Sequence, residues 1–497
     1  MPIEIPSLNL TALAPSLIVI VTALLLLLFD LGLTDKHILG YLALVGVALA
    51  FGVSIAMGMH PPQAFQSMVV SDGYALFFNL IFLVAAGLSL LVAIDYLERH
   101  DMQHGEYYAL LLFSTSGMML MAAATDLIVV FLALEIMSVS LYILAGFRRG
   151  QIASTEAAMK YFILGAFASA FFLYGAALTY GATGTTNLIK IGVWLSGSGI
   201  PQELDPLALV GLGLLLVGFA FKVAAVPFQW WTPDVYQGAP TSVVAFMSVG
   251  AKGAGFAALI RVLHFAFGST PYIARWSIAV GILAALTMTV GNLIALNQKD
   301  IKRMLGYSSI AHAGYILVGV AAANDSGVRG VLFYLMAYAF MNVGAFAVAS
   351  VVERRGEFSS TLRDYAGLSR REPLLAAAMA VFMLSLTGIP PLVGFWGKLF
   401  VFRAAVESGQ SWLAVVGVIN SAISAFYYLG VVVQMYMHSP QEYAPLLHGE
   451  ESQSAQLASI HLPAAVGMAV LLAMLLTVIL GLWPGPVAAL VTMMPLR

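Results

Sequence analysis

Apolar residues occur in long runs along this chain, separated by short stretches of glycine, proline and charged residues. An α-helix rises about 1.5 Å per residue, so about 20 apolar residues cross the ~30 Å hydrocarbon core of a membrane. The pattern predicts an all-α polytopic membrane protein of about fourteen transmembrane helices. We expect them near 13–33, 38–58, 74–96, 107–124, 126–147, 157–182, 207–237, 241–267, 275–297, 304–323, 328–352, 373–406, 411–437 and 463–490.

The segments between these runs are short, apart from 183–206, 353–372 and 438–462. None of the three is long enough to fold as a separate soluble domain. The sequence therefore predicts a single transmembrane domain over 1–497.

Composition excludes several classes of protein. Hydrophobic residues make up 61% of the 497 residues and charged residues 9%, where a soluble domain carries about 25%. This rules out a soluble enzyme and a disordered chain. The net charge of −2 argues against a nucleic-acid partner and leaves the lipid bilayer as the expected surroundings.

Cysteine is absent, and the nine histidines are scattered. Disulfides, thiolate metal sites and iron–sulfur clusters are therefore excluded. No pair of histidines has a spacing that would hold a haem or a zinc ion. We expect no cofactor and no metal bound within this chain.

The basic residues predict how the chain is oriented. Segments after odd-numbered spans contain Lys36, Arg99, Arg148, Arg149, Lys299, Lys302, Arg303, Arg354, Arg355, Arg363, Arg370 and Arg371. Segments after even-numbered spans contain little beyond Lys190, Arg275 and Arg329. By the positive-inside rule the odd-numbered side is cytoplasmic, in a bacterial plasma membrane, and both termini lie on the other side.

Prolines interrupt two of the spans. Pro227 and Pro233 fall in the seventh, and Pro390 and Pro391 fall in the twelfth. Proline removes a backbone donor and clashes with the preceding turn, so both spans are expected to be broken helices.

The two broken spans are five spans apart, which predicts two inverted five-helix repeats, spans 4–8 (107–267) and spans 9–13 (275–437). Interrupted helices at matching positions of two repeats indicate an ion or substrate path near the middle of the membrane. The alternative is that each proline only kinks a packing helix.

Charged residues inside the predicted spans are the candidate site. Placing a charge at the centre of a membrane costs about 2.5–3.5 kcal/mol, so such residues usually face protein or water and have a function. The candidates are Glu135 in span 5, Lys222 in span 7, Lys252 in span 8 and Lys398 in span 12, with His312 as a possible relay between the repeats. Structural ion pairs, snorkelling lysines and a packing histidine are the alternatives.

These residue types are suited to proton transfer. A lysine in a medium of low dielectric constant loses much of its preference for the charged form, and a nearby carboxylate restores it. Glu135 and Lys222 are expected to form such a pair, with Lys252 and Lys398 continuing the path. Lys160, Arg261 and Arg403 lie nearer span ends, where snorkelling is expected.

Two sequence strings, together with the glutamate of span 5, resemble a known family. They are FKVAAVPFQWWTPDVYQGAPTSVVAFMSVGAKGAG and LTGIPPLVGFWGK. They are similar to the antiporter-like subunits of proton-pumping NADH:quinone oxidoreductase, respiratory complex I. Among those subunits the chain looks most like the N type: the L type carries a long lateral helix after its fourteen spans, and the M type typically has glutamate where Lys398 stands.

The resemblance implies roles for the candidate residues. Glu135, Lys222, Lys252 and Lys398 match the family's span-5 glutamate and its span-7, span-8 and span-12 lysines, and His312 matches more loosely. It implies that the chain moves protons only, because NADH, FMN, iron–sulfur clusters and quinone belong to other subunits. The implied partners are the antiporter-like M and L types and the small K, J and A types.

Two other functions remain open. A subunit of a multisubunit sodium/proton antiporter would share the fold and the lysines. An independent carrier of a small solute can also use inverted repeats. The proteins that co-purify with the chain would distinguish the three.

Overall fold

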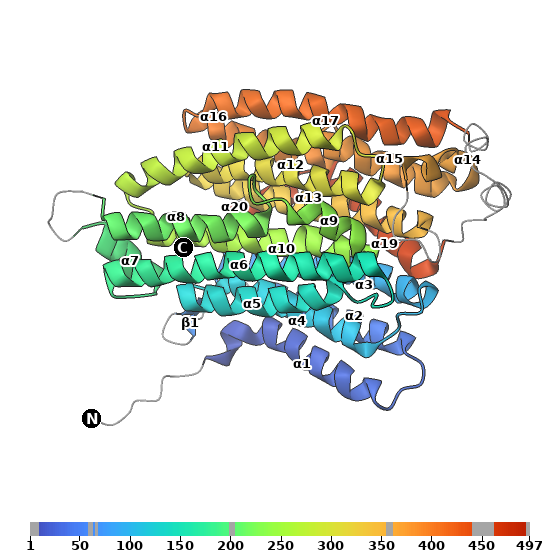
Figure 1. The fold of residues 1–497 in the computed structure, drawn as a ribbon, viewed down its shortest axis with the longest axis horizontal. Coiled ribbons are helices and arrows are strands. Elements are labelled where there is room, and N and C mark those ends of the chain that lie inside the picture. Colours follow the sequence, from blue (N-terminus) through green and yellow to red (C-terminus); the bar gives the residue numbers. More distant parts are fainter. Residues whose placement is uncertain are drawn as a thin grey trace.

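The computed structural model describes residues 9–57, 63–64, 68–197, 204–353, 361–439 and 462–493. Arg354 and Arg355 of the predicted basic loops lie outside these ranges, as do the outermost residues of both termini. Within the described residues, twelve helices are long and apolar enough to cross a membrane. Figure 1 shows the helices side by side as one bundle. The chain is a multi-pass membrane protein, as the sequence predicted.

The long helices follow one another with short connections. In chain order they are α1 (Ala14–Asp30), α2 (His37–Ala56), α3 (Gly73–Arg99), α4 (Gly105–Ala123), α5 (Leu127–Ala145), α6 (Ile152–Thr183), α8 (Pro206–Val223), α10 (Thr241–Arg261), α11 (Thr270–Ala295), α12 (Ile301–Ala321), α13 (Asp325–Val352), α17 (Ser411–Met437) and α19 (Ala464–Leu482).

Shorter elements lie between them or at their ends. They are the 3-10 turns η1 (Leu10–Leu13) and η3 (Leu362–Tyr365), the π-helical turn η2 (Val262–Ala266), and the helices α7 (Leu188–Leu195), α9 (Trp231–Gly238), α14 (Leu368–Arg371), α15 (Pro373–Thr387), α16 (Val393–Glu407) and α20 (Gly485–Thr492). Strands β1 (Gln63–Ala64) and β2 (Val69–Val70) pair antiparallel, with Gln63 opposite Val70.

Two predicted spans are not among the twelve helices. Helix α4 occupies the first, 107–124, but Glu106, two tyrosines and several hydroxyl residues lower its mean hydropathy. The second, 373–406, is divided into α15 and α16, which have 15 residues each. Both positions belong to the bundle, because α4 packs against α1 and α5, and α16 packs against α13.

Helices α10 and α13 form the centre of the bundle: α10 is buried along its whole length, and α13 is buried from residue 330 to its end. Glycines let neighbouring helices approach α10 closely. A Cβ atom at Gly250 would lie 2.6 Å from the sulfur of Met118 on α4, and one at Gly255 would lie 3.0 Å from Val223 on α8. Polar side chains on the central helices are thereby kept away from the lipid.

Both predicted helix breaks are present. Helix α8 ends at Val223, and the chain continues without helix until α9 begins at Trp231. Helix α15 ends at Thr387, and α16 begins at Val393. The prediction that Pro233 also interrupts the helix is wrong, because Pro233 lies in the first turn of α9, where its missing N–H has no partner to lose.

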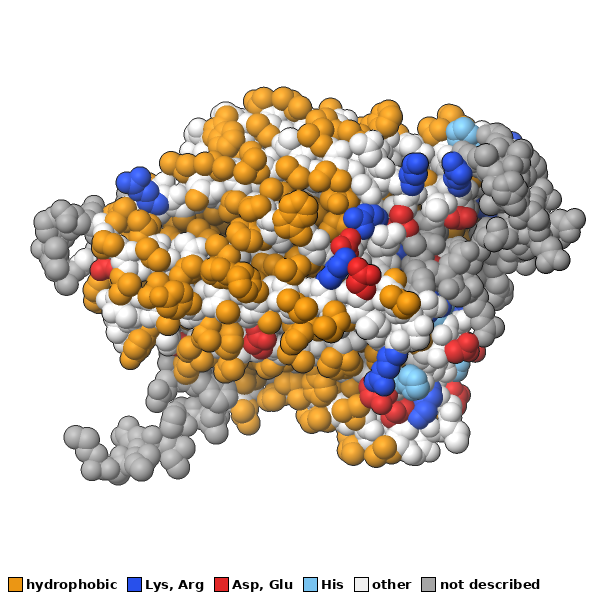
Figure 2. Space-filling model, in the orientation of Figure 1, with side chains coloured by type: hydrophobic (Ala, Val, Ile, Leu, Met, Phe, Trp, Pro, Cys, Tyr) orange, Lys and Arg blue, Asp and Glu red, His pale blue; other side chains and the backbone are white. Residues whose placement is uncertain are grey.

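Charged side chains gather at one end of the bundle, where α5 ends and α12 begins. Figure 2 shows basic, acidic and histidine side chains clustered there, while the middle of the visible face carries mainly hydrophobic side chains and very few charged ones. This band of apolar side chains is the part suited to contact with lipid.

Arg261 corrects one sequence-based prediction. Snorkelling was expected, but the side chain is fully buried, and its Nη1 and Nη2 donate to the two carboxylate oxygens of Asp72 at 3.0 and 2.8 Å. Its Nε donates to the carbonyl of Ala122 at 2.9 Å. Asp72 also caps the N-terminus of α3, accepting from the N–H of Ala75. The cap fixes the carboxylate where the arginine reaches it.

Replacing Arg261 with Met is expected to destabilise the protein strongly. It leaves the buried Asp72 carboxylate unpaired, a loss of about 3–5 kcal/mol. The thermal unfolding midpoint of the purified protein in detergent measures the effect. Adding Asp72→Asn should restore part of it, because the amide keeps the cap without the charge. Arg275→Met, at an exposed position, is the control; equal midpoints for Arg261→Met and this control would contradict the prediction.

Candidate functional site

Lys222 lies buried in the last turn of α8. Its Nζ donates to Ser138 Oγ at 2.8 Å and to the Tyr142 hydroxyl at 3.3 Å, both on α5. The rings of Tyr142, Tyr161 and Phe221 have their centroids 5.5, 5.9 and 5.5 Å from the same nitrogen. Hydroxyl groups and aromatic faces therefore replace water around this ammonium group.

Glu135 lies three residues before Ser138 on α5 and is only partly buried. It lies near Lys222 but not in direct contact with it: within the described chain, no lysine, arginine or histidine nitrogen lies within 4.0 Å of the Glu135 carboxylate. Its Oε1 is buried and has no hydrogen-bond partner in the described chain. The direct partners of the ammonium are Ser138 and Tyr142.

Lys252 lies on the central helix α10 and is buried. Its Nζ donates to Ser309 Oγ on α12 at 2.7 Å and lies 5.6 Å from the ring centroid of Tyr236 on α9. Ser309 in turn donates to the carbonyl of Gly306 in its own helix. Lys252 thus connects the first predicted repeat to α12 of the second.

His312 lies one turn after Ser309 on α12 and is buried among tyrosines. Its Nδ1 is 2.8 Å from the Tyr334 hydroxyl on α13, and its Nε2 is 3.0 Å from the Tyr428 hydroxyl on α17. Tyr428 also shares a hydrogen bond with Ser308. A neutral imidazole donates from one nitrogen and accepts at the other, and tyrosine hydroxyls can take either part. His312 therefore fits both a relay and a packing role.

Lys398 lies buried near the start of α16. Its Nζ donates to the carbonyl of Thr387, the last residue of α15, at 2.8 Å and lies 4.5 Å from the ring centroid of Tyr315. Gly388, with φ of +93°, makes the turn after α15. A Cβ atom there would lie 3.0 Å from Lys398 Cδ, so glycine leaves room for the lysine as well as permitting the turn.

Lys222 and Lys398 each lie beside a helix break, on opposite sides of it in the sequence. Lys222 lies in the last turn of α8, before its break, and its ammonium contacts hydroxyl groups of α5. Lys398 lies after its break, and its ammonium contacts the last carbonyl of α15. The carbonyls at a helix C-terminus carry partial negative charge and stabilise a cation, so the second break provides a site for a positive charge inside the bundle.

A network of amides and tyrosines extends the polar groups beyond His312. Asn292 on α11 donates to Tyr315 at 3.1 Å and to Asn420 Oδ1 at 3.3 Å, and it accepts from Tyr427 at 2.9 Å. These residues lie between α11, α12 and α17. Asn292, Asn420 and Tyr427 were not among the predicted site residues, although an asparagine within a predicted span indicates a hydrogen bond between helices.

Each predicted site residue therefore has polar partners of its own and does not hydrogen-bond to another predicted site residue within the described chain. Lys222 donates hydrogen bonds to Ser138 and Tyr142, and Lys252 donates to Ser309. His312 shares hydrogen bonds with two tyrosines. Hydroxyl groups can accept and donate a proton in turn, so the arrangement can carry protons through the interior of the bundle. Within the described residues, no group of three or more histidine, aspartate or glutamate side chains is placed to hold a metal ion.

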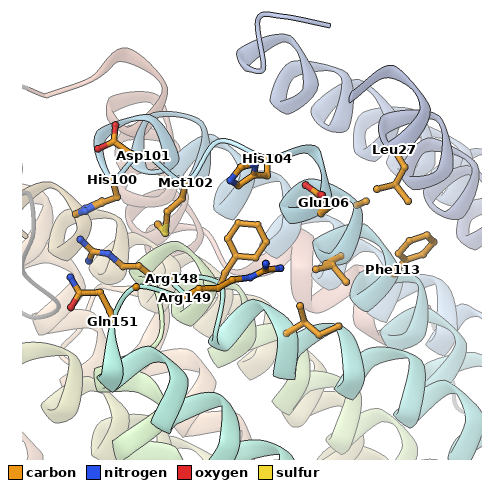
Figure 3. A pocket seen from close by; sticks show the side chains of 15 residues that line it. Leu27, His100, Asp101, Met102, His104, Glu106, Phe113, Arg148, Arg149 and Gln151 are labelled. Atoms are coloured by element: carbon orange, nitrogen blue, oxygen red, sulfur yellow. The ribbon is translucent and has the colours of Figure 1, made fainter. Parts of the chain in front are cut away.

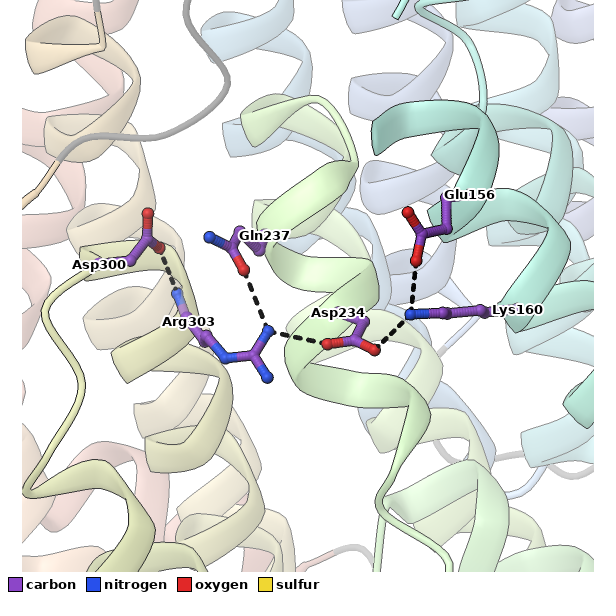
Figure 4. A network of polar contacts seen from close by, with 6 residues as sticks. All are labelled: Glu156, Lys160, Asp234, Gln237, Asp300 and Arg303. Atoms are coloured by element: carbon purple, nitrogen blue, oxygen red, sulfur yellow. Dashed lines mark hydrogen bonds and ion pairs between the residues drawn. The ribbon is translucent and has the colours of Figure 1, made fainter. Parts of the chain in front are cut away.

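A second polar cluster lies at the charged end of the bundle (Figure 4). Asp234 on α9 forms ion pairs with Lys160 of α6 and Arg303 of α12, each at 2.8 Å. Lys160 also pairs with Glu156 at 2.7 Å. Lys160 thus links α6 to α9 and is not a simple snorkelling side chain. Among the described residues, Arg403 forms an ion pair with its neighbour Glu407 and no other, and its side chain is largely exposed, consistent with the end of a span.

The chain is similar to one protein family over residues 124–424, described as "NADH:quinone oxidoreductase/Mrp antiporter, TM". It is 51% identical over 438 residues to a relative from Trichlorobacter lovleyi named NADH-quinone oxidoreductase subunit N, which covers 88% of this chain and 89% of the relative. A relative of the same name from Chloroflexus aggregans is 46% identical over 495 residues, covering 98% of each chain.

Solved structures give the same likeness. A chain of respiratory complex I from Thermus thermophilus with bound aureothin is 38% identical, with a TM-score of 0.79, and the match covers 96% of this chain and 98% of that one. A chain of the Mrp complex from Dietzia sp. DQ12-45-1b is 22% identical, with a TM-score of 0.84, and the match covers 98% and 97%. At that identity the second match indicates a common fold alone.

Proposed function

This chain belongs to the NADH:quinone oxidoreductase/Mrp antiporter membrane family and to its NADH-quinone oxidoreductase subunit N members, and on that basis we propose that it translocates protons as one membrane subunit of a proton-pumping NADH:quinone oxidoreductase. The observation that carries the proposal is a set of buried ionisable groups with polar partners inside the bundle. Lys222, Lys252 and His312 have hydroxyl partners, and Lys398 has a backbone carbonyl. Buried charges inside a membrane are seldom kept without a function.

The proposed path has five ionisable members. Protons reach Lys222, whose charge is influenced by Glu135, and pass through Lys252 and the His312 tyrosine cluster to Lys398. The hydrogen bonds from Lys252 to Ser309, and from His312 to its two tyrosines, support the middle of this path. Internal water would connect the members that do not touch.

The proposed architecture is two inverted repeats, 107–267 and 275–437. The breaks between α8 and α9 and between α15 and α16, each with a buried lysine beside it, support this pairing. The basic residues at one end of the bundle support a cytoplasmic location for that end, in a bacterial plasma membrane with both termini on the opposite side.

Redox groups are proposed to reside in partner subunits. The family name refers to NADH and quinone chemistry, and the buried site residues of this chain are lysines, a histidine and their polar partners. The partners would be the antiporter-like M and L types and the small K, J and A types. Energy from their electron transfer would then drive the movement of protons here.

Membership in a multisubunit sodium/proton antiporter is the second candidate. The family description includes Mrp antiporters, and the Dietzia chain has the same fold. The identity of 22% to that chain, against 51% to a subunit N relative, favours the first proposal.

Purification through a tag on this chain, directly from its native membrane, tests the proposed function. We expect flavin and iron–sulfur subunits to co-purify, and vesicles containing the assembly to acidify when NADH and quinone are supplied. Lys222→Met should lower acidification at least about tenfold without changing which subunits co-purify.

Lys190→Met, on the exposed face of α7, is the control for that variant and should pump normally. Co-purification of sodium/proton antiporter subunits without flavin would instead establish the second candidate. Normal pumping by Lys222→Met would remove this lysine from the path.

A further inference from the structure

A pocket of about 750 Å³ opens at the charged end of the bundle, away from the buried lysines. The turn between α3 and α4 forms one wall, and the turn between α5 and α6 forms the other (Figure 3). The proposed proton path makes no use of this pocket.

The two polar walls carry charges of opposite sign. Arg148 and Arg149 line one side, and His104 and Glu106 line the other (Figure 3). Arg149 and Glu106 are exposed and form no ion pair with each other within 4.0 Å. An occupant with both an anionic and a cationic group would meet a partner on each wall.

The floor of the pocket is apolar. Leu27 of α1, Leu110 and Phe113 of α4 and Ile143 of α5 line it. Helix α4 is recessed between α1 and α5 at this point, since Leu110 and Phe113 are partly buried while Ile143 is 47% exposed. This floor is therefore continuous with the apolar surface of α1 and α5 that is suited to lipid.

We propose that this pocket binds a phospholipid with a phosphate and a primary ammonium in its headgroup, the phosphatidylethanolamine class. The phosphate lies toward Arg149, the ammonium lies toward Glu106, and an acyl chain follows the groove over α4. Basic pockets between transmembrane helices at the membrane surface commonly hold lipid headgroups. The carboxylate of Glu106 gives this pocket a preference for a zwitterion over an anionic lipid.

The primary ammonium matters because it donates hydrogen bonds. Phosphatidylcholine has the same net charge, but its quaternary ammonium has no N–H group. Phosphatidylglycerol has the phosphate and no cation, so it would leave Glu106 facing a negative charge. Comparison of the three lipids therefore separates a site for the ammonium from a general attraction to phosphate.

Native mass spectrometry of the delipidated assembly containing this chain tests the proposal. With dioleoyl forms of the three lipids supplied equally, we expect phosphatidylethanolamine to be retained about fivefold more than either other lipid, as one additional charge-assisted hydrogen bond would give. Arg149→Gln and Glu106→Gln should each lower this retention about fivefold. Glu106→Gln should also raise retention of phosphatidylglycerol, which a merely structural effect would not do.

Arg275→Gln, an exposed arginine outside the pocket, should retain the lipids as the natural protein does. Equal retention of all three lipids, or no effect of the two pocket variants, would overturn the proposal. So would a preference for phosphatidylglycerol in the natural protein. These readouts do not depend on proton pumping.

A segment of a partner subunit is the competing occupant. The chain has no cysteine, so Arg149→Cys gives a single thiol that can be cross-linked in the intact assembly. Cross-linking of this thiol to a photoactivatable phosphatidylethanolamine supports the lipid site. Cross-linking to a neighbouring subunit instead would overturn it.

Discussion

Lys252→Met is expected to reduce vesicle acidification about a hundredfold while the assembly remains intact. Lys252 is the lysine of the central helix α10, and its ammonium contacts Ser309 of α12, the helix that carries His312. Methionine approximates the length of the side chain and adds no polar group to a buried site. The variant therefore removes the proton carrier and leaves the packing close to that of the natural protein.

The effect of Lys252→Met should exceed that of His312→Ala. Tyr334 and Tyr428 approach His312 from two helices, and water in the space left by alanine can bridge their hydroxyl groups. Parallel assays of acidification, with Lys190→Met as the exposed control, give the ranking. A larger loss in His312→Ala would mean that the imidazole itself connects the two halves.

The main features of the fold followed from the sequence because they depend on local physics. Apolar length predicted the spans, and Pro227 and Pro390 predicted the breaks, since a proline acts on its own helix. The rule fails at Pro233, where a first-turn position makes proline harmless. The membrane location followed from the long apolar runs with few charges, because only helices that satisfy their backbone groups and carry apolar side chains are stable in lipid.

The partners of the site residues could not be predicted in the same way. Ser309 and Ser138 look like any small residues of a membrane helix. Only the three-dimensional arrangement brings Lys252 of α10 to Ser309 and the Lys222 side chain of α8 to Ser138. Glu135 and Lys222 were expected to form a pair, but nothing in the sequence indicated that hydroxyl groups on α5 would be the direct partners of the ammonium. The burial of Arg261 could not be predicted, because the sequence does not show that Asp72, the cap of α3, lies beside it.

The environment of Lys398 leads to the second prediction of large effect. The ammonium contacts the last carbonyl of α15, where the helix dipole favours a positive charge. Span 12 begins beside the arginines of α14, and Lys398 lies in its second half, so we place it on the release side of the path. A lysine there gives up its proton when Lys252 presents another, because two ammonium groups in a low-dielectric path repel each other.

Lys398→Glu is therefore expected to pump about tenfold more slowly than Lys398→Arg, and both variants more slowly than the natural protein. A tenfold difference in rate corresponds to about 1.4 kcal/mol in the activation barrier. Glutamate places a negative charge against the Thr387 carbonyl and turns the repulsion from Lys252 into attraction. Arginine keeps the positive charge but resists deprotonation, and it must fit beside Gly388. The rates of vesicle acidification by the two variants, with Lys190→Glu as the exposed control, test this prediction. Equal and near-normal rates in both would leave Lys398 as a packing residue, because a release site cannot tolerate both a reversed charge and a proton that does not leave.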